Sequence, residues 1–258
     1  MQTQDDGATA WNGRVVRVDR GQVRVVGPHG DAVTARVAVP VSEPVDAPCV
    51  GDWVTVAVAG DDRTVVEIQP RRTLLERAEP GGSSRRQALA ANVDTVAVVV
   101  ALDQMPSLEK VERLLVVAWS SGASVRVVLT KADLAADAGD VAEEVATQLG
   151  VDAIVCSTRT GEGIAEVAAL VAPGATLALV GSSGAGKSSL ANVLAGQELI
   201  ETASIRADGR GRHTTVRREL VAIPGAGWVV DTPGLRGVGV TDPEGLAGAF
   251  ADVEELVG

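Results

Sequence analysis

Aromatic residues and cysteines are scarce in this sequence. Only 2% of its 258 residues are aromatic, with no tyrosine and a single phenylalanine. A nucleic-acid surface that stacks bases on aromatic rings is therefore not expected. The two cysteines, Cys49 and Cys156, lie far apart and have no partners at metal-ligand spacing. This pattern argues against both a disulfide framework and a zinc site.

Long hydrophobic runs are also missing. No run approaches the roughly 18–20 apolar residues that cross a bilayer. The first ten residues are polar and acidic, unlike a signal peptide. Apolar residues make up 46% of the chain and charged residues 22%, which is a globular composition. We therefore expect a cytoplasmic monomer that does not contact a membrane.

Positive charge is outnumbered, and the net charge is −11. Residues 1–90 contain 11 basic and 12 acidic residues, whereas residues 91–258 contain 12 and 22. Such acidity makes non-specific binding to nucleic acid weak. Arginines nevertheless cluster between positions 71 and 86 and between 206 and 218. These clusters either contact phosphates or form ordinary solvated surface, and the sequence leaves both interpretations open.

The first seventy residues predict short strands separated by turn residues. The expected strands are 13–18, 22–26, 33–39, 53–58 and 64–68. Five short strands predict a small barrel of the oligonucleotide-binding (OB) type over residues 1–79, which by itself implies no particular ligand. Arg14, Arg17, Arg20 and Arg24 are spaced to share one face of the first hairpin. That face would contact RNA phosphates, or would be a solvated strand edge protected by charge.

Residues 80–84 have the sequence Pro-Gly-Gly-Ser-Ser, which predicts a linker and a domain boundary. After them the pattern changes to apolar strands that alternate with helices. Apolar strands are expected at 95–102, 125–130, 153–156, 176–180 and 228–230. Helices are expected at 108–121, 141–149, 163–171 and from 187 to about 194. This alternation predicts an α/β domain over residues 80–250, with a mainly parallel sheet covered on both faces.

Residues 181–188 match the phosphate-loop pattern G-x-x-x-x-G-K-[ST], between an apolar strand and a helix. Glycines let backbone N–H groups surround phosphate oxygens, and the helix N-terminus adds positive potential. Lys187 is expected to reach the β- and γ-phosphates and to take part in catalysis, and the Ser188 hydroxyl to bind Mg²⁺. The nucleotide-binding residues expected here are Gly181, Ser182, Ser183, Gly184, Ala185, Gly186, Lys187, Ser188 and Ser189.

A second motif, Thr130-Lys131-Ala132-Asp133, ends an earlier strand and resembles the guanine-reading pattern [NT]-K-x-D. Asp133 would accept hydrogen bonds from N1–H and the amino group of guanine, whereas adenine offers no matching pair of donors. Lys131 would lay its aliphatic stem along the base. Thr130 and Leu134 belong to the same nucleotide-binding segment. Ser157 follows the next strand, and we expect it in the loop whose backbone N–H contacts guanine O6.

The switch elements are expected near the end of the chain. Asp231-Thr232-Pro233-Gly234 fits D-x-x-G after a strand, so Asp231 would hold Mg²⁺ and the Gly234 N–H would sense the γ-phosphate. Either Thr214 or Thr215 would supply the switch threonine that binds Mg²⁺.

The order of the motifs is rotated relative to ordinary G domains, in which the phosphate loop comes first. Here the two base-reading segments precede the phosphate loop, and D-x-x-G comes last. Such a permutation preserves the site because chain termini on a compact domain can be rejoined elsewhere.

The permuted order, the preceding barrel and the local sequences resemble the circularly permuted small-ribosomal-subunit-dependent GTPases, the RsgA/YjeQ family. The matching segments are residues 85–87, 90–94, 129–134, 181–184, 210–215 and 231–234. The resemblance implies a Mg²⁺-dependent GTPase that acts late in assembly of the small ribosomal subunit. It also implies that the barrel contacts ribosomal RNA and that the subunit stimulates hydrolysis. Family members usually carry a zinc-binding segment after this domain; residues 251–258 are only a short stub, so zinc is not expected.

The position that often carries a water-orienting Gln is Leu235, which cannot orient water. His213 is the nearest candidate for that catalytic role, while Arg210 or Arg212 would offset charge on the phosphates. Slow intrinsic turnover is therefore expected. Two alternatives stay open: an RNA-binding assembly factor that uses GTP only as a conformational switch, and a P-loop ATPase, which Asp133 disfavours.

Overall fold

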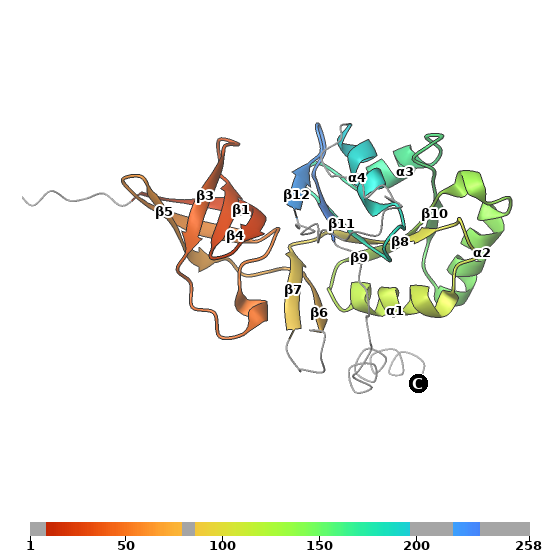
Figure 1. Cartoon of the computed structure of the whole chain (residues 1–258), viewed down its shortest axis with the longest axis horizontal. Coiled ribbons are helices and arrows are strands. Elements are labelled where there is room, and N and C mark those ends of the chain that lie inside the picture. The colour runs from red at the N-terminus through yellow and green to blue at the C-terminus, as the bar shows by residue number, and fades with distance from the viewer. Residues whose placement is uncertain (1–8, 79–85, 197–218, 233–258) are drawn as a thin grey trace, which may run out of the picture.

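The computed structural model describes residues 9–78, 86–196 and 219–232, and the fold is presented for these residues (Figure 1). Its N-terminal part is a barrel of five strands, as expected. The strands are β1 (Thr9–Asp19), β2 (Gln22–Val26), β3 (Ala32–Val37), β4 (Trp53–Ala59) and β5 (Asp62–Ile68). They pair in the order β1-β2-β3-β5-β4, and β1 closes the barrel by also pairing with β4. The β3–β5 pair is parallel and the other pairs are antiparallel.

Alternating valines explain why these segments form a closed barrel. Val23 and Val25 on β2 and Val54 and Val56 on β4 are fully buried in one cluster. Residues between them face outward, which is the period of two that a half-buried strand requires. The close approach of β1 to β2 also requires glycine at position 13, because a Cβ there would lie 2.7 Å from the carbonyl oxygen of Val26.

A mixed sheet forms the centre of the α/β domain. Its strands are β8 (Thr95–Ala101), β9 (Ser124–Thr130), β10 (Ala153–Val155), β11 (Thr176–Val180), β12 (Glu219–Ala222) and β13 (Trp228–Asp231). Five of them are parallel in the order β10-β9-β8-β11-β13, and β12 adds antiparallel to β13. The mainly parallel sheet is therefore confirmed, whereas β12 was not expected.

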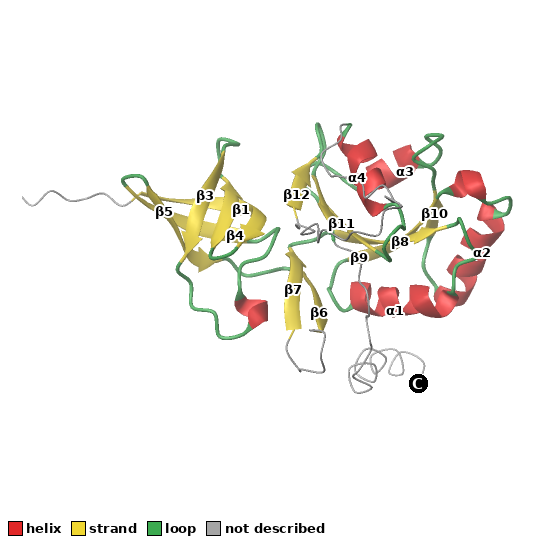
Figure 2. Cartoon of the chain, viewed as in Figure 1, coloured by secondary structure: helices red, strands yellow, loops and turns green. Residues whose placement is uncertain are grey.

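Helices cover both faces of this sheet (Figure 2). They are α1 (Leu108–Trp119), α2 (Ala138–Leu149), α3 (Ile164–Ala169) and α4 (Lys187–Ala195), with short 3-10 turns at Pro44–Asp46 and Ala132–Leu134. On β8, Val96 and Val98 pack in the cluster that contains residues of α1 and α2. The intervening Ala97 and Val99 pack in the cluster that contains residues of α3 and α4. A strand buried on both sides is apolar at every position, which is what the continuous apolar runs indicated.

The expected linker lies between two paired strands. β6 (Leu74–Ala78) and β7 (Arg86–Ala91) form an antiparallel hairpin on either side of residues 79–85, which lie outside the described residues. Leu75 and Leu89 are buried in the core cluster shared with α1 and α2. On the barrel side, Ala90 forms a β-bridge with Val50. The boundary expected near residue 80 lies outside the described residues, in the segment that connects β6 to β7.

Among the described residues, no helix is long and apolar enough to cross a membrane.

Candidate nucleotide-binding site

The sequence motifs meet at one edge of the sheet. Parallel strands place their carboxyl ends at the same edge, and ligands of open α/β sheets bind there. Asp103 follows β8, Thr130 ends β9, Ser157 follows β10, Gly181 follows β11 and Asp231 ends β13. Segments that are more than a hundred residues apart in the chain therefore form a single site.

The phosphate loop connects β11 to α4. Gly184 and Gly186 have φ angles of 82° and 88°, a left-handed conformation that favours glycine. At Gly181, a Cβ would lie only 2.3 Å from the carbonyl oxygen of Val99 on β8. Glycine at these positions lets the chain turn tightly and leaves backbone N–H groups available for an anion at the start of α4.

Lys187 is folded into this loop. Its ammonium group donates hydrogen bonds to the carbonyl oxygens of Gly181 (3.1 Å) and Ser182 (2.9 Å), and only 6% of the residue is exposed. Burial lowers the pKa of Lys187, and the nearby Asp231 opposes this shift. A cation held in this way is positioned to meet the charge of a phosphate group.

Ser188 and Asp231 fit a magnesium site. The Ser188 hydroxyl donates a 2.6 Å hydrogen bond to Oδ2 of Asp231, whereas the buried Oδ1 of Asp231 has no hydrogen-bond partner among the described residues. Burial raises the pKa of Asp231, because an ionised carboxylate loses hydration there. A hydroxyl and an orphaned carboxylate oxygen are hard donors of the kind that Mg²⁺ prefers.

Thr130 joins the base-reading segment to the phosphate loop. Its buried hydroxyl donates to the carbonyl oxygen of Ala185 at 2.7 Å, across 55 residues of sequence. The next residue, Lys131, has a left-handed φ of 58° and pairs with Asp103 at 2.6 Å. Asp103 was not anticipated from the sequence, although an acidic residue directly after an apolar strand is a usable signal.

Asp133 is held by two donors. The Ser157 hydroxyl donates to Oδ1, and Nε of Arg159 donates to Oδ2 at 2.7 Å. The hydrogen bond from Ser157 and the charge of Arg159 together lower the pKa of Asp133. Arg159 was not anticipated from the sequence.

The backbone N–H of Ser157 is already engaged within the loop expected to contact guanine O6. It donates to the carbonyl oxygen of Glu162 at 2.9 Å, so this group is not available for guanine O6. The reason is the tight turn of residues 157–162, which uses the Ser157 N–H to close itself. Within the described part of the chain, the neighbouring Thr158 N–H has no hydrogen-bond partner.

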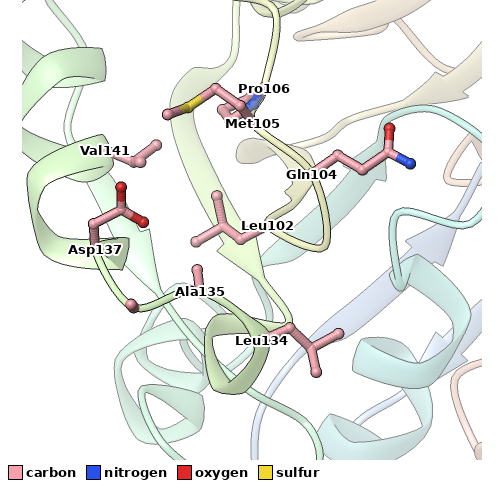
Figure 3. Close-up of a pocket in the computed structure, with 9 residues that line it drawn as sticks. Leu102, Gln104, Met105, Pro106, Leu134, Ala135, Asp137 and Val141 are labelled. Atoms are coloured by element: carbon pink, nitrogen blue, oxygen red, sulfur yellow. The ribbon is translucent and has the colours of Figure 1, made fainter.

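Leu134 lies beside the base-reading segment on the surface. It is 61% exposed and lines a hollow together with Leu102, Met105 and Val141 (Figure 3). This hollow separates the loop after β8 from the start of α2. Ser189 lies in the first turn of α4, beyond the phosphate loop. His213, Thr214, Thr215 and Gly234, together with Arg210, Arg212 and Leu235, lie outside the described residues.

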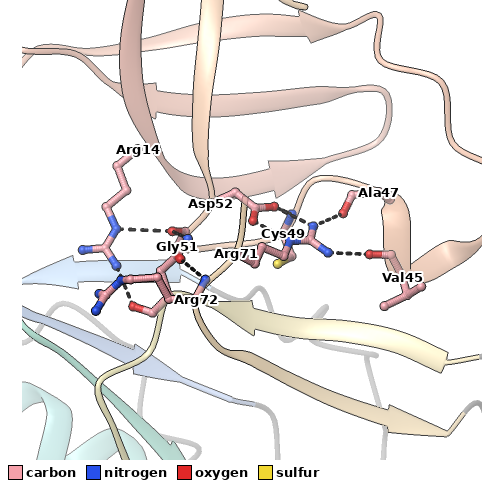
Figure 4. A network of polar contacts seen from close by, with 9 residues as sticks. Arg14, Val45, Ala47, Cys49, Gly51, Asp52, Arg71 and Arg72 are labelled. Atoms are coloured by element: carbon pink, nitrogen blue, oxygen red, sulfur yellow. Dashed lines mark hydrogen bonds and ion pairs between the residues drawn. The ribbon is translucent and has the colours of Figure 1, made fainter. Parts of the chain in front are cut away.

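Arg14 connects the barrel to the strands that carry the site (Figure 4). Its guanidinium donates to Oγ1 of Thr176 on β11 (2.6 Å) and to the carbonyl oxygen of Asn92 (3.3 Å). It also lies over the rings of Trp53 and Trp228, 5.4 and 5.8 Å from their centroids. Burial lowers the pKa of Arg14 to about 10.

The spacing allowed several of the four barrel arginines to share one face of the first hairpin, but Arg14 is not available on such a face. The α/β domain covers its part of β1 and leaves 4% of the residue exposed. Arg17 and Arg24 are cross-strand partners on β1 and β2, and Arg17 pairs with Asp19 at 3.1 Å.

A second buried contact stabilises the barrel side of the junction. Arg71 binds both carboxylate oxygens of the fully buried Asp52, at 2.7 and 2.8 Å. It also donates to the carbonyl oxygens of Val45 (2.6 Å) and Ala47 (2.8 Å). Bidentate pairing of this kind satisfies a buried carboxylate that would otherwise be costly.

Comparison with known proteins places this geometry in context. The family model of the RsgA GTPase matches residues 68–241. The chain is 46% identical over 250 residues to the small ribosomal subunit biogenesis GTPase RsgA of Streptomyces avermitilis, covering 95% of this chain and 67% of that protein. It is 36% identical over 261 residues to RsgA 1 of Listeria innocua, covering 99% of this chain and 74% of that protein.

Two solved structures share the fold. The crystal structure of YjeQ from Thermotoga maritima superposes with a TM-score of 0.65 at 23% identity, covering 95% of this chain and 93% of that one. The circularly permuted GTPase YloQ superposes with a TM-score of 0.66 at 23% identity, covering 99% and 82%.

Proposed function

The chain belongs to the RsgA GTPase family, and on that premise we propose that GTP binds along the sheet edge formed by β8, β9, β10, β11 and β13. The chain is accordingly a GTPase of small ribosomal subunit biogenesis. The single observation that carries the proposed site is the hydrogen bond from Thr130 to Ala185, because it joins the base-reading segment to the phosphate loop.

The triphosphate lies against the phosphate loop. Backbone N–H groups of residues 181–186 face its oxygens, and the Lys187 ammonium exchanges its contacts with Gly181 and Ser182 for the β- and γ-phosphates. Ser188 and Asp231 would hold Mg²⁺, which would supply positive charge beside the phosphates. Thr214 or Thr215 and the Gly234 N–H complete this end of the site.

The base lies against the segment 130–134. Asp133 accepts hydrogen bonds from N1–H and the amino group of guanine, and the aliphatic stem of Lys131 covers one face of the ring. The Thr158 N–H is the donor for guanine O6, since the Ser157 N–H is already bonded. An adenine base would leave the Asp133 carboxylate without its donors, and this is costly for a nearly buried charge.

Hydrolysis by the isolated chain is slow. Leu235 cannot orient the attacking water, so His213 takes this role, with Arg210 or Arg212 offsetting phosphate charge. Such residues act well only when a partner holds them in place. The small ribosomal subunit is that partner, and it stimulates turnover.

The barrel provides the contact with ribosomal RNA. Arg17 and Arg24 are cross-strand partners on β1 and β2, so two positive side chains lie close together where a phosphate could bind, although Arg17 is already paired with Asp19. With few aromatic residues on the barrel, contacts to the phosphates of structured RNA are favoured over base stacking.

Turnover of GTP by the purified chain, with and without small ribosomal subunits, tests this function. We expect slow turnover alone and a marked increase with subunits, together with competition by GTP and GDP but not ATP. Lys187→Ala should abolish nucleotide binding, whereas Lys110→Ala, on the exposed side of α1, should leave it intact. Nucleotide binding without any stimulated turnover would instead favour a factor that uses GTP only as a conformational switch.

A further inference from the structure

The open side of Asp133 is occupied by Arg159. Only 8% of the Asp133 side chain is exposed, whereas 72% of the Arg159 side chain is exposed. Arg159 comes from the turn after β10 and donates from Nε to Oδ2 at 2.7 Å. On the other oxygen, the fully buried Ser157 donates its hydroxyl from within the protein. A base that approaches Asp133 from solvent therefore meets Arg159 before it meets the carboxylate.

Arginine and guanine offer the same chemistry to a carboxylate. The N1–C2–N2 edge of guanine is a guanidine fragment with neighbouring N–H donors, and the arginine side chain presents the same fork. Adenine has no such pair of donors on that edge. Arg159 thus makes to Oδ2 the type of hydrogen bond that guanine is expected to make.

We propose that Arg159 is an intramolecular competitor of the base for Asp133, and that the need to displace it lowers the association rate and the apparent affinity for nucleotide. The inference rests on the proposed function, which assigns Asp133 to base recognition. Guanine replaces every hydrogen bond that Asp133 loses when Arg159 leaves. Adenine does not, so its entry would leave Oδ2 without a donor, and only the hydrogen bond from Ser157 to Oδ1 would remain.

The exposure of Arg159 makes this exchange rapid and inexpensive. Because the Arg159 guanidinium is open to water and salt, its pairing with Asp133 is screened from that side. Ser157 stays in place and keeps the carboxylate oriented while Arg159 moves into solvent. Because the apparent affinity is the intrinsic affinity reduced by the fraction of open sites, removal of Arg159 should tighten GDP binding about two- to five-fold.

Stopped-flow binding of a ribose-labelled fluorescent GDP to the full chain tests the proposal. The variant is Arg159→Gln, which keeps the length of the side chain but removes the guanidinium. The matched control is Arg113→Gln, because Arg113 is also an exposed arginine in an ion pair, with Glu109 on α1. We expect Arg159→Gln to raise the association rate about two- to five-fold and to leave the dissociation rate unchanged. The preference for GDP over ADP should also be unchanged, because Arg159 must leave before either base can bind. The control should match the unmodified chain in all three.

Salt gives a second readout. High ionic strength screens the Arg159–Asp133 pair, so the ratio of association rates between Arg159→Gln and the unmodified chain should approach one. A faster dissociation rate in Arg159→Gln would overturn the proposal, since it would mean that Arg159 holds the bound base. An unchanged or slower association rate would also overturn it. Failure of the unmodified chain to bind GDP would instead refute the proposed function.

Discussion

The Ser188 hydroxyl donates a 2.6 Å hydrogen bond to the Asp231 carboxylate, although the two residues are 43 positions apart. This contact joins the start of α4 to the end of β13, and so joins the phosphate loop to the D-x-x-G segment. Oδ1 of Asp231 remains buried and without a partner among the described residues. The negative charge of the buried Asp231 carboxylate is therefore unfavourable in the free chain, and a cation bound at Oδ1 would stabilise it.

Asp231→Asn should make the folded chain more stable and at the same time impair its use of Mg²⁺. Burial raises the pKa of Asp231, so its ionised form costs free energy in the folded chain at neutral pH, and that cost disappears as pH falls through the raised pKa. The neutral amide should therefore increase the free energy of unfolding at pH 7 by about 1 kcal/mol. The same change should remove the dependence of GTP binding and turnover on Mg²⁺.

Urea denaturation and nucleotide titration, each with and without Mg²⁺, measure the two effects of Asp231→Asn. Asp140→Asn, on the exposed side of α2, is the control for loss of one negative charge. A destabilised Asp231→Asn chain that still responded to Mg²⁺ would be incompatible with this role.

Asp133→Asn should change the preferred base from guanine to xanthine. An amide offers an N–H donor where the carboxylate only accepts, so it matches xanthine, which carries a carbonyl at C2, better than guanine. Loss of two charge-assisted hydrogen bonds should weaken GDP binding about a hundredfold or more. Calorimetric titration with GDP and xanthosine diphosphate checks the exchange, and equal loss of affinity for both nucleotides would count against base recognition by Asp133.

Ser157→Ala should raise the pKa of Asp133. The hydrogen bond from Ser157 is the largest cause that holds this pKa below its ordinary value of 3.8. A carboxyl with a depressed pKa stabilises the folded chain above its unfolded-state pKa, and that contribution is lost as pH falls through the lower folded-state pKa. Ser157→Ala should therefore be less stable than the unmodified chain at pH 7, and the difference should shrink below about pH 3.8.

An NMR titration of the Asp133 carboxyl measures the shift directly. Thr160→Ala serves as a control in the same turn, since the Thr160 hydroxyl accepts a hydrogen bond from the Glu162 N–H. An identical titration curve in Ser157→Ala and the unmodified chain would show that Ser157 does not brace the carboxylate.

Arg14→Lys should weaken the junction between the barrel and the sheet. Nη2 of Arg14 donates to both Thr176 and Asn92, and Nε donates to Gly51; a lysine side chain is one bond shorter and has no second donor group, so buried acceptors lose a partner. We expect the free energy of unfolding to fall by about 1–3 kcal/mol. The exposed substitution Arg24→Lys on the neighbouring strand should change it by less than about 0.5 kcal/mol. Equal effects of the two substitutions in urea denaturation would contradict the role assigned to Arg14.

Local pattern was enough to predict most of the fold. The expected strands at 22–26 and 176–180 match β2 and β11 residue for residue, because alternation and continuous burial leave a direct trace in the chain. The hairpin of β6 and β7 was missed. Its second strand is rich in alanine and follows a segment of Pro, Gly and Ser, so nothing local distinguished a strand from a linker.

The residue types and spacing of the motifs determined by themselves that this chain carries the phosphate-loop pattern and the [NT]-K-x-D pattern in the permuted order of its family. Only the tertiary structure decided which groups within them are already engaged. The Ser157 N–H is used by its own turn, Arg14 is covered by a neighbouring domain, and Arg159 lies on Asp133. Hydrogen bonds and burial depend on which surfaces meet in space. The groups that meet come from segments far apart in the sequence, so no local pattern can predict them.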